Sequence, residues 1–227
     1  RPEVSAVLTD VNTSGNPLTG GFVGGGTVCD GEDISGVSVL FPAMTKVITL
    51  NVSNCGLGPS AMPELSKLVR DASAVLTEVN ASGNPLTGGY VYSSGIIKKG
   101  DDISGVSILF PAMTKVITLN ISNCGLGPSA MPELSKLVRD ASAALARVSV
   151  LSNPIGADGA DALIQVFEQN TNLRTLLGIE EGVTELNLSQ KNVDPVEAKI
   201  LVAELKANRA AVALVSVNIS ANCIGTA

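Results

Sequence analysis

Residues 47–57 read Val-Ile-Thr-Leu-Asn-Val-Ser-Asn-Cys-Gly-Leu. Apolar side chains stand at the first, fourth, sixth and last positions of this stretch, and Cys55 lies between the last two of them. The stretch therefore has the spacing L-x-x-L-x-L-x-x-(N/C)-x-L. Taken alone, it indicates a short buried strand that carries one cysteine.

The same spacing recurs along the chain. Its first positions are residues 8, 47, 76, 116, 145, 183 and 214, so that long and short steps alternate. Repetition with such a period predicts a solenoid, in which no single unit can bury its own apolar face. Residues 1–227 then form a single domain of about seven stacked units.

Each strand unit is followed by apolar residues with the spacing of one helix face. In the second unit these residues are Met62, Leu65, Leu68, Val69 and Ala72. In the sixth unit the corresponding residues are Ala198, Leu201, Val202 and Leu205. The alternation of strand, turn and helix predicts an α/β fold built from parallel βα layers with right-handed crossovers.

A larger duplication overlies these units. Residues 5–72 and 73–141 have nearly the same sequence, shifted by 68 or 69 positions. Each copy contains an inserted loop, Gly20–Asp33 in the first and Gly88–Asp102 in the second. The glycine content of both loops indicates mobile, exposed segments. Copies this similar are typical of a recent duplication or of an assembled array.

The composition excludes several functional classes. A net charge of −6 without a basic cluster argues against nucleic acid and anionic membranes as partners. The chain has no histidine, so it lacks the commonest general base and the commonest zinc ligand. No stretch approaches the ~18 apolar residues that a membrane-spanning helix needs. We therefore expect no catalytic activity, no cofactor and no bound metal.

Two acidic segments and one glycine run have compositions that occur in ligand sites. Asp30–Asp33 and Lys99–Asp102 lack the ligand spacing of a calcium loop, and carboxylates just before a helix commonly cap it. The glycine run at residues 24–26 has no G-K-[ST] after it, so it does not indicate a phosphate-binding loop. Helix capping is the interpretation that we prefer for both acidic segments.

The repeated motif resembles the leucine-rich repeat family, and within it the ribonuclease-inhibitor-like class. The strongest local match is the stretch 148–163, and units with Asn16 and Asn84 alternate with units that carry Cys55 and Cys124. The resemblance implies a horseshoe with strands on its concave face and helices on its convex face. It also implies protein binding without catalysis.

The chain departs from that family in two respects. Lys191 stands where the motif has Asn or Cys, so we expect an irregular turn in the sixth unit. Neither end has a recognisable cap, so the interpretation is an uncapped fragment of a longer array.

Strand alternation directs one set of side chains to the predicted concave face. A column of asparagines and a column of serines two residues further along would form a neutral polar surface for a partner, or a solvated ladder that bonds between strands. Two tyrosines of the second loop offer large contact areas, and a few charges lie at the edge of the column. The candidate partner-binding residues are Asp10, Asn12, Asn51, Glu78, Asn80, Tyr90, Tyr92, Asn120, Arg147, Asn187 and Asn218.

The asparagine column also creates N-x-S sequences at six positions. Because they recur at one place in the repeat, we interpret them as by-products of the repeat and expect a cytoplasmic protein. Glycosylation at these asparagines would instead place the protein outside the cell. Cys55 and Cys124 are expected to be buried small side chains, whereas Cys29 and Cys223 are candidates for accessible thiols.

The leading functional hypothesis is a protein–protein interaction module that uses the concave surface and the inserted loops. The alternative is a structural scaffold, engineered or duplicated, that has no evolved ligand or that associates end to end. The sequence does not identify the partner protein.

Overall fold

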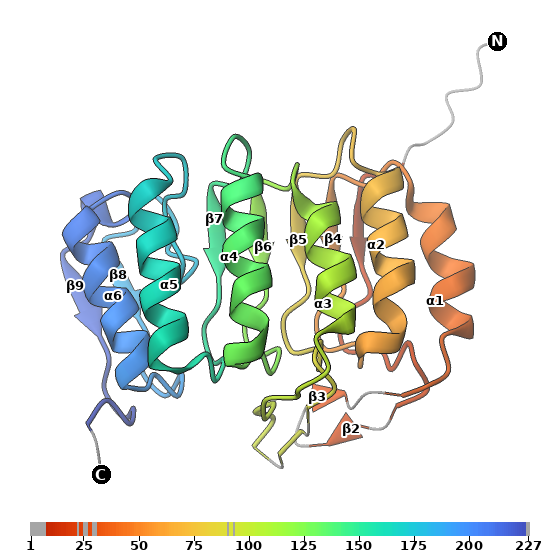
Figure 1. The fold of residues 1–227 in the computed structure, drawn as a ribbon, viewed down its shortest axis with the longest axis horizontal. Coiled ribbons are helices and arrows are strands. Elements are labelled where there is room, and N and C mark those ends of the chain that lie inside the picture. Colours follow the sequence, from red (N-terminus) through yellow and green to blue (C-terminus); the bar gives the residue numbers. More distant parts are fainter. Residues whose placement is uncertain are drawn as a thin grey trace.

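The computed structural model describes residues 8–21, 23–24, 27–28, 31–89, 91–92 and 94–225. It is an α/β protein in which short parallel strands alternate with helices (Figure 1). Five strands form one parallel sheet in chain order: β1 (Asp10–Asn12), β4 (Thr49–Asn51), β5 (Glu78–Asn80), β6 (Thr118–Asn120) and β7 (Arg147–Ser149). A second parallel pair consists of β8 (Glu185–Asn187) and β9 (Ser216–Asn218). Every one of these strands covers the third to fifth residues of a predicted strand unit.

The helices stand in a row on one face of the strands (Figure 1). They are α1 (Ser35–Leu40), α2 (Met62–Asp71), α3 (Ser104–Leu109), α4 (Met131–Asp140), α5 (Gly156–Gln169) and α6 (Pro195–Ala207). Short 3-10 segments extend this row: η1 (Phe41–Met44), η2 (Pro59–Ala61), η3 (Phe110–Met113), η4 (Pro128–Ala130) and η5 (Ala211–Ala213). Two short strands, β2 (Val23–Gly24) and β3 (Thr27–Val28), pair antiparallel within the first inserted loop.

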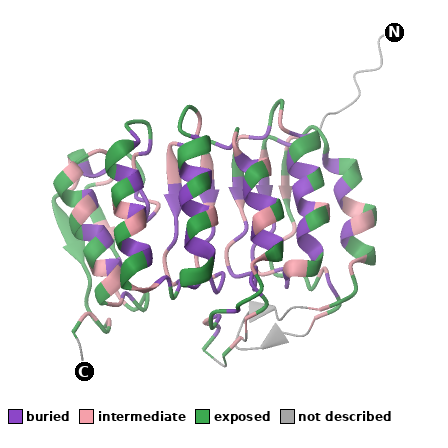
Figure 2. Ribbon diagram, viewed as in Figure 1, coloured by how far each residue is buried: buried purple, intermediate pink, exposed green. Residues whose placement is uncertain are grey.

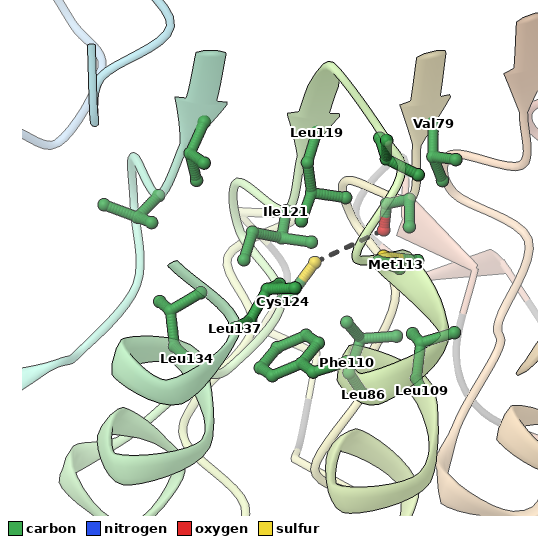
Figure 3. Packing of buried hydrophobic residues seen from close by; sticks show 14 of the residues in the cluster. Val79, Leu86, Leu109, Phe110, Met113, Leu119, Ile121, Cys124, Leu134 and Leu137 are labelled. Carbon is green, nitrogen blue, oxygen red and sulfur yellow. Dashed lines mark hydrogen bonds between the residues drawn. The ribbon is translucent and has the colours of Figure 1, made fainter. Parts of the chain in front are cut away.

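The core lies between the strands and the helices (Figure 2). Strand register aligns the central apolar residue of each strand, so Leu50 pairs with Val79 and Val79 with Leu119. These side chains are buried and meet the apolar faces of the helices, whose phenylalanines at 41, 110 and 167 are fully buried. Figure 3 shows one layer of this packing around Cys124. The predicted face of α2 is confirmed, because all five of its residues are buried.

Two buried asparagines, Asn84 and Asn153, fix the turns that follow β4 and β6. The Asn84 side-chain oxygen accepts hydrogen bonds from the backbone N–H groups of Cys55 (2.9 Å) and Leu57 (3.0 Å). The Asn84 amide nitrogen donates to the carbonyl groups of Val52 and Ala81. Asn153 makes the same bonds to the next Cys-type unit. These bonds satisfy backbone groups that burial would otherwise leave unpaired.

The expectation of an irregular sixth turn is wrong. Lys191 and Val193 donate their backbone N–H groups to Asn222, the same pattern that Cys55 and Leu57 make with Asn84. The turn depends on backbone donors and on the asparagine of the next unit, so the side chain at position 191 is free to be exposed. A change from cysteine to lysine therefore leaves the turn intact.

An irregular segment, residues 173–182, runs beside β7, and the repeat pattern did not reveal it. Backbone N–H groups of Val148 and Val150 donate to the carbonyls of Thr175 and Leu176, and isolated bridges join Arg147 to Thr175 and Ser149 to Leu177. The described segment between Leu173 and Gly182 thus takes the place next to β7 where a sixth strand of the sheet would lie. In the described residues no regular ladder joins β7 to β8, and the parallel strands fall into the two groups given above.

The predicted buried face of α6 is also wrong in part. Val202 and Leu205 are 48% and 38% exposed, whereas Glu197 and Glu204 are only 2% exposed and Ile200 is completely buried. The physical reason is the adjacent irregular segment, whose backbone N–H groups require acceptors that leucine cannot supply. Helix α6 is therefore turned so that two carboxylates face the interior.

The second inserted loop is not the fully exposed segment that its glycines suggested. Val91 and Ile97 form an antiparallel bridge, and Ile97 is 1% exposed. The Asn123 side chain donates to the carbonyl of Gly95 and accepts from the N–H of Ile97, each at 2.8 Å. The predictions for Tyr90 and Cys29 lie outside the described residues. Within the described part of the chain, no helix is long and apolar enough to cross a membrane.

Candidate functional site

The asparagine column lies at the carboxyl ends of the parallel strands. Ladder pairing puts Asn12 beside Asn51, Asn51 beside Asn80, and Asn80 beside Asn120. Each side-chain oxygen accepts a hydrogen bond from the backbone N–H two residues further along; the asparagines are Asn12, Asn51, Asn80, Asn120, Asn187 and Asn218. These bonds close each strand end locally. Of the ladder between strands that was the alternative interpretation, the described residues contain the bond between Ser122 and Ser149, and no bond joins two asparagines of the column.

This arrangement leaves the amide nitrogens of the column for other acceptors. Among the described residues, none of these six NH₂ groups donates a hydrogen bond. Neighbouring parallel strands are about 4.8 Å apart, so the first four asparagines set out a regular row of donors. The column can thus donate hydrogen bonds to carbonyl or carboxylate oxygens.

A groove of about 530 Å³ opens where this polar surface meets the irregular segment after β7. Two predicted residues, Asn120 and Arg147, line it. Ser82 and Ser122 of the predicted serine column line it as well, and so does Ser149, which stands in the asparagine column. The lining residues Asn123, Glu180 and Lys191 were not predicted. The remaining predicted positions lie outside the groove, namely Asp10, Asn12, Asn51, Glu78, Asn80, Tyr92, Asn187 and Asn218.

The irregular segment forms one wall of the groove because a glycine allows close approach. Gly178 has a φ of +74°, and a β-carbon at this position would lie 2.8 Å from the β-carbon of Ser149. Ser149 in turn shares a 2.7 Å hydrogen bond with Ser122 on the neighbouring strand turn. The small hydroxyl side chains of Ser122 and Ser149 therefore form the floor of the groove, and the irregular segment packs against Ser149 at Gly178.

The groove carries charges of both signs. Arg147 on β7 is partly buried. Glu180, in the irregular segment, and Lys191, in the turn after β8, are exposed. None of these three takes part in an ion pair within the described residues. Their charged groups are therefore available to a partner, and Arg147 has the geometry to bind a carboxylate with two parallel hydrogen bonds.

A second cavity of about 430 Å³ lies between the second inserted loop and the sixth unit. Tyr92, which is 51% exposed, lines it together with Ile96 and Pro154. The cavity and the groove both include Ser152, so this residue separates the two. The prediction that Tyr92 offers a contact surface is thus compatible with its place, although it lies outside the groove itself.

Two buried carboxylates of α6 hold segments beside the groove: Glu204 bonds to the irregular segment and Glu197 bonds to the turn at Ser152. Glu204 accepts hydrogen bonds from the Thr175 hydroxyl (2.9 Å), the Leu177 N–H (2.7 Å) and the Leu176 N–H. Glu197 accepts from the N–H groups of Ser152 and Asp194. Burial raises the pKa of each carboxyl group to about 7, more than the hydrogen bonds lower it, and the charge of Asp194 raises the pKa of Glu197 further.

The cysteines and the acidic segments fall outside this site. Cys55 and Cys124 are completely buried, as predicted, and burial raises the pKa of Cys124 to about 12. Cys223 is exposed. Asp33 and Asp102 accept hydrogen bonds from the N–H groups of Ser35 and Ser104, the first residues of α1 and α3, although the residues at the N-cap positions are Ile34 and Ile103. The described residues contain no group of three or more potential metal ligands.

The fold and the groove together define a parallel α/β protein with a polar surface at the carboxyl ends of its strands. Comparisons with known proteins add no family to this description. No protein-family model matches the sequence, and no curated protein is significantly similar to it.

Proposed function

We propose that the chain is a leucine-rich-repeat solenoid, similar to the ribonuclease-inhibitor-like class, and that it binds a partner protein. The single observation that carries the proposal is the groove beside β7, where the free side-chain amide of Asn120 lies among the unpaired charges of Arg147, Glu180 and Lys191. Strand positions that agree with the repeat spacing, together with helices on one side only, support the solenoid interpretation. The proposal includes no catalysis, since a histidine base is missing from the sequence.

The chemistry of the surface suggests what the partner presents. The asparagine column offers NH₂ donors, and Arg147 offers a bidentate site for one carboxylate. We therefore infer a protein segment with acidic side chains and accessible backbone carbonyls, bound across the strand ends. Interfaces of this polar type gain specificity from paired charges more than they gain affinity.

A groove-blocking variant tests the proposal. Ser122→Arg places a long side chain over the groove floor and keeps the backbone bond to Asn120. Gln165→Arg adds the same charge on the exposed surface of α5, on the helix side of the molecule. Both variants must first show the thermal midpoint of the unmodified protein.

The readout is quantitative affinity capture followed by mass spectrometry. We expect at least one protein to be retained by the unmodified chain and by Gln165→Arg, and to be lost with Ser122→Arg. The same set of retained proteins for all three baits would contradict the groove as the binding site. An empty capture with every bait would favour the scaffold alternative.

A further inference from the structure

A second groove, of about 400 Å³, lies on the helix side of the molecule between α4 and α5. Its lining is largely apolar and includes Met131 and Pro132 of α4 and Ala162 and Val166 of α5. Each of the two helices also packs on its other side, α4 against η3 and α5 against α6, so the groove does not depend on where the chain begins or ends. A groove of this volume accommodates a small organic molecule.

One buried polar atom of this groove has no partner. Ser135 lines the groove and is only 5% exposed, and its hydroxyl oxygen is buried without a hydrogen bond to the described residues. Arg139 lines the groove one helical turn further along, and its exposed guanidinium group makes no hydrogen bond or ion pair within the described part of the chain. Residues four apart share a helix face, so two free donors lie close together here. Buried hydroxyl groups are normally paired, so this site lacks an acceptor.

The duplicated sequence shows the same serine with its acceptor in place. In the first copy, Ser66 donates a hydrogen bond of 3.1 Å to the carbonyl of Ile108 in α3, and Arg70 donates to the Ser66 hydroxyl oxygen. The Ile108 carbonyl is one of the last four of α3, which the helix itself leaves without donors. Helices α2 and α4 have the identical sequence MPELSKLVRD. The difference between Ser66 and Ser135 therefore comes from the helix that packs against each of them.

Helix α5 supplies neither the carbonyl nor the side chain that α3 supplies. A β-carbon on Gly105 of α3, or on Gly159 of α5, would lie 2.7 Å from the Cγ atom of the first methionine of the preceding helix, so the two glycines are equivalent. Three residues after each glycine, Ala162 takes the place of Ile108. Alanine lacks the γ- and δ-carbons of isoleucine, and the Ala162 carbonyl is bonded within the continuous helix α5. Because Ala162 lines the groove, the empty volume corresponds to an aliphatic group and a carbonyl oxygen.

The charges at this groove give it a direction. Asp158 precedes Gly159, which packs against Met131, whereas Arg139 stands eight residues after Met131. At 1.5 Å per residue, the two charged residues lie about 12 Å apart along the helices. Neither of them takes part in an ion pair within the described residues. A negative group is therefore attracted to the Arg139 end of the groove and repelled from the Asp158 end.

We propose that the groove between α4 and α5 binds a small carboxylate with a branched aliphatic body. The carboxylate accepts hydrogen bonds from the Ser135 hydroxyl and the Arg139 guanidinium group, and the aliphatic body packs beside Ala162. The charge of Asp158 disfavours the reverse orientation. This site lies on the helix side of the molecule, so it does not depend on the partner protein proposed for the groove beside β7.

An NMR titration of the full chain with β-methylvalerate tests the site, because this probe keeps the side chain and carbonyl carbon of isoleucine and carries a carboxylate. We expect saturable shifts of the backbone amides of Ser135, Arg139 and Ala162 at millimolar concentrations. The neutral β-methylvaleramide has the same shape and should bind about tenfold more weakly, since it forms no charge-assisted hydrogen bond with arginine. The proposal is overturned by an absence of saturable shifts, by equal binding of the amide, or by shifts confined to the groove around Arg147.

Matched variants in the two copies locate the ligand. Arg139→Gln should weaken binding of β-methylvalerate about tenfold, whereas Arg70→Gln makes the same change in the first copy and should leave binding unchanged. Ala162→Ile restores the residue of the first copy and should abolish binding by filling the groove. Ser135→Ala removes only an unpaired hydroxyl, so it should weaken binding without lowering the thermal midpoint. Equal affinities of Arg139→Gln and Arg70→Gln, or undiminished binding by Ala162→Ile, would contradict the assignment.

Discussion

Asn16 and Asn84 occupy the same position in two nearly identical stretches of sequence, yet Asn84 is completely buried and Asn16 is exposed. Asn84 accepts two backbone hydrogen bonds from the preceding unit and donates to two of its neighbours' carbonyls. Asn16 donates to Thr13, and its side-chain oxygen accepts no hydrogen bond from the described residues. A unit that precedes Asn84 is described, whereas none is described before Asn16.

This pair gives the first prediction. Asn84→Ala should lower the free energy of unfolding by about 3 kcal/mol, because it leaves two buried N–H groups without an acceptor. Asn16→Ala should lower it by less than about 1 kcal/mol. Chemical denaturation of both variants measures the difference. Equal losses would mean that Asn84 does not support the turn of the preceding unit.

The second inserted loop depends on one side chain. Asn123→Ala removes both hydrogen bonds to the loop, so the Ile97 amide should exchange with deuterium at least tenfold faster, a change of about 1.4 kcal/mol in local opening. Asn54→Ala is the matched control, since Asn54 and Asn123 both have a φ of 51° and therefore share the backbone cost of alanine. If exchange at Ile97 is no faster in Asn123→Ala than in Asn54→Ala, contacts other than the two hydrogen bonds of Asn123 hold the loop.

The two buried glutamates predict an unusual dependence of stability on pH. Their folded pKa values of about 7 lie above the ordinary value of 4.5, so both carboxyl groups stay protonated in the folded chain after they ionise in the unfolded chain. The contribution of these two groups to the free energy of unfolding should therefore be largest below about pH 4.5 and should fall as the pH rises towards 7. Above that, their contribution is constant.

The variant Glu197→Gln/Glu204→Gln tests this effect. Glutamine keeps an acceptor oxygen but does not ionise, so the fall in stability between pH 4.5 and 7 should shrink by an amount on the order of a few kcal/mol. Glu168→Gln, an exposed glutamate on α5, is the control. A pH profile of unfolding that is unchanged in the double variant would mean that the pKa values of both carboxyl groups are the same in the folded and the unfolded chain.

Thiol labelling followed by peptide mapping should separate the cysteines. Cys223 should react at the rate of a free exposed thiol, whereas Cys55 and Cys124 should react only after unfolding. The reason is twofold: burial blocks the reagent, and it raises the pKa of both thiols, so little thiolate is present at neutral pH. Rapid native labelling of Cys124 would show that the core layer of Figure 3 opens readily.

The sequence predicted the strands well because their burial depends on spacing alone. Leu50, Val79 and Leu119 recur at fixed positions, and parallel pairing follows from that repetition. The place of the irregular segment beside β7 was not predicted, because this segment contains only the first two apolar positions of the motif, Leu173 and Leu176. A search for partial units at the period of its neighbours could have found it, since Leu173 follows Leu145 by 28 residues.

The candidate site was predicted less completely. Asn120 and Arg147 were identified because strand alternation directs them outward. Glu180 and Lys191 come from segments whose path depends on the irregular segment, and no local pattern indicates where they lie. Buried carboxylates such as Glu204 run against the usual exposure of glutamate, so only the three-dimensional arrangement of the Leu176 and Leu177 donors reveals them.

The interrupted sheet has a consequence for how the molecule unfolds. In a linear array each unit contacts only its neighbours, so cooperativity is limited by the weakest junction. The junction between β7 and β8 lacks a regular strand ladder and relies on α5, α6 and the two ionisable carboxylates. As the pH rises from 4.5 to 7, this junction should therefore weaken and an equilibrium intermediate should become populated in which residues 183–225 are unfolded while the five-stranded part remains native. The protein then behaves as two cooperative segments joined by a proton-dependent coupling.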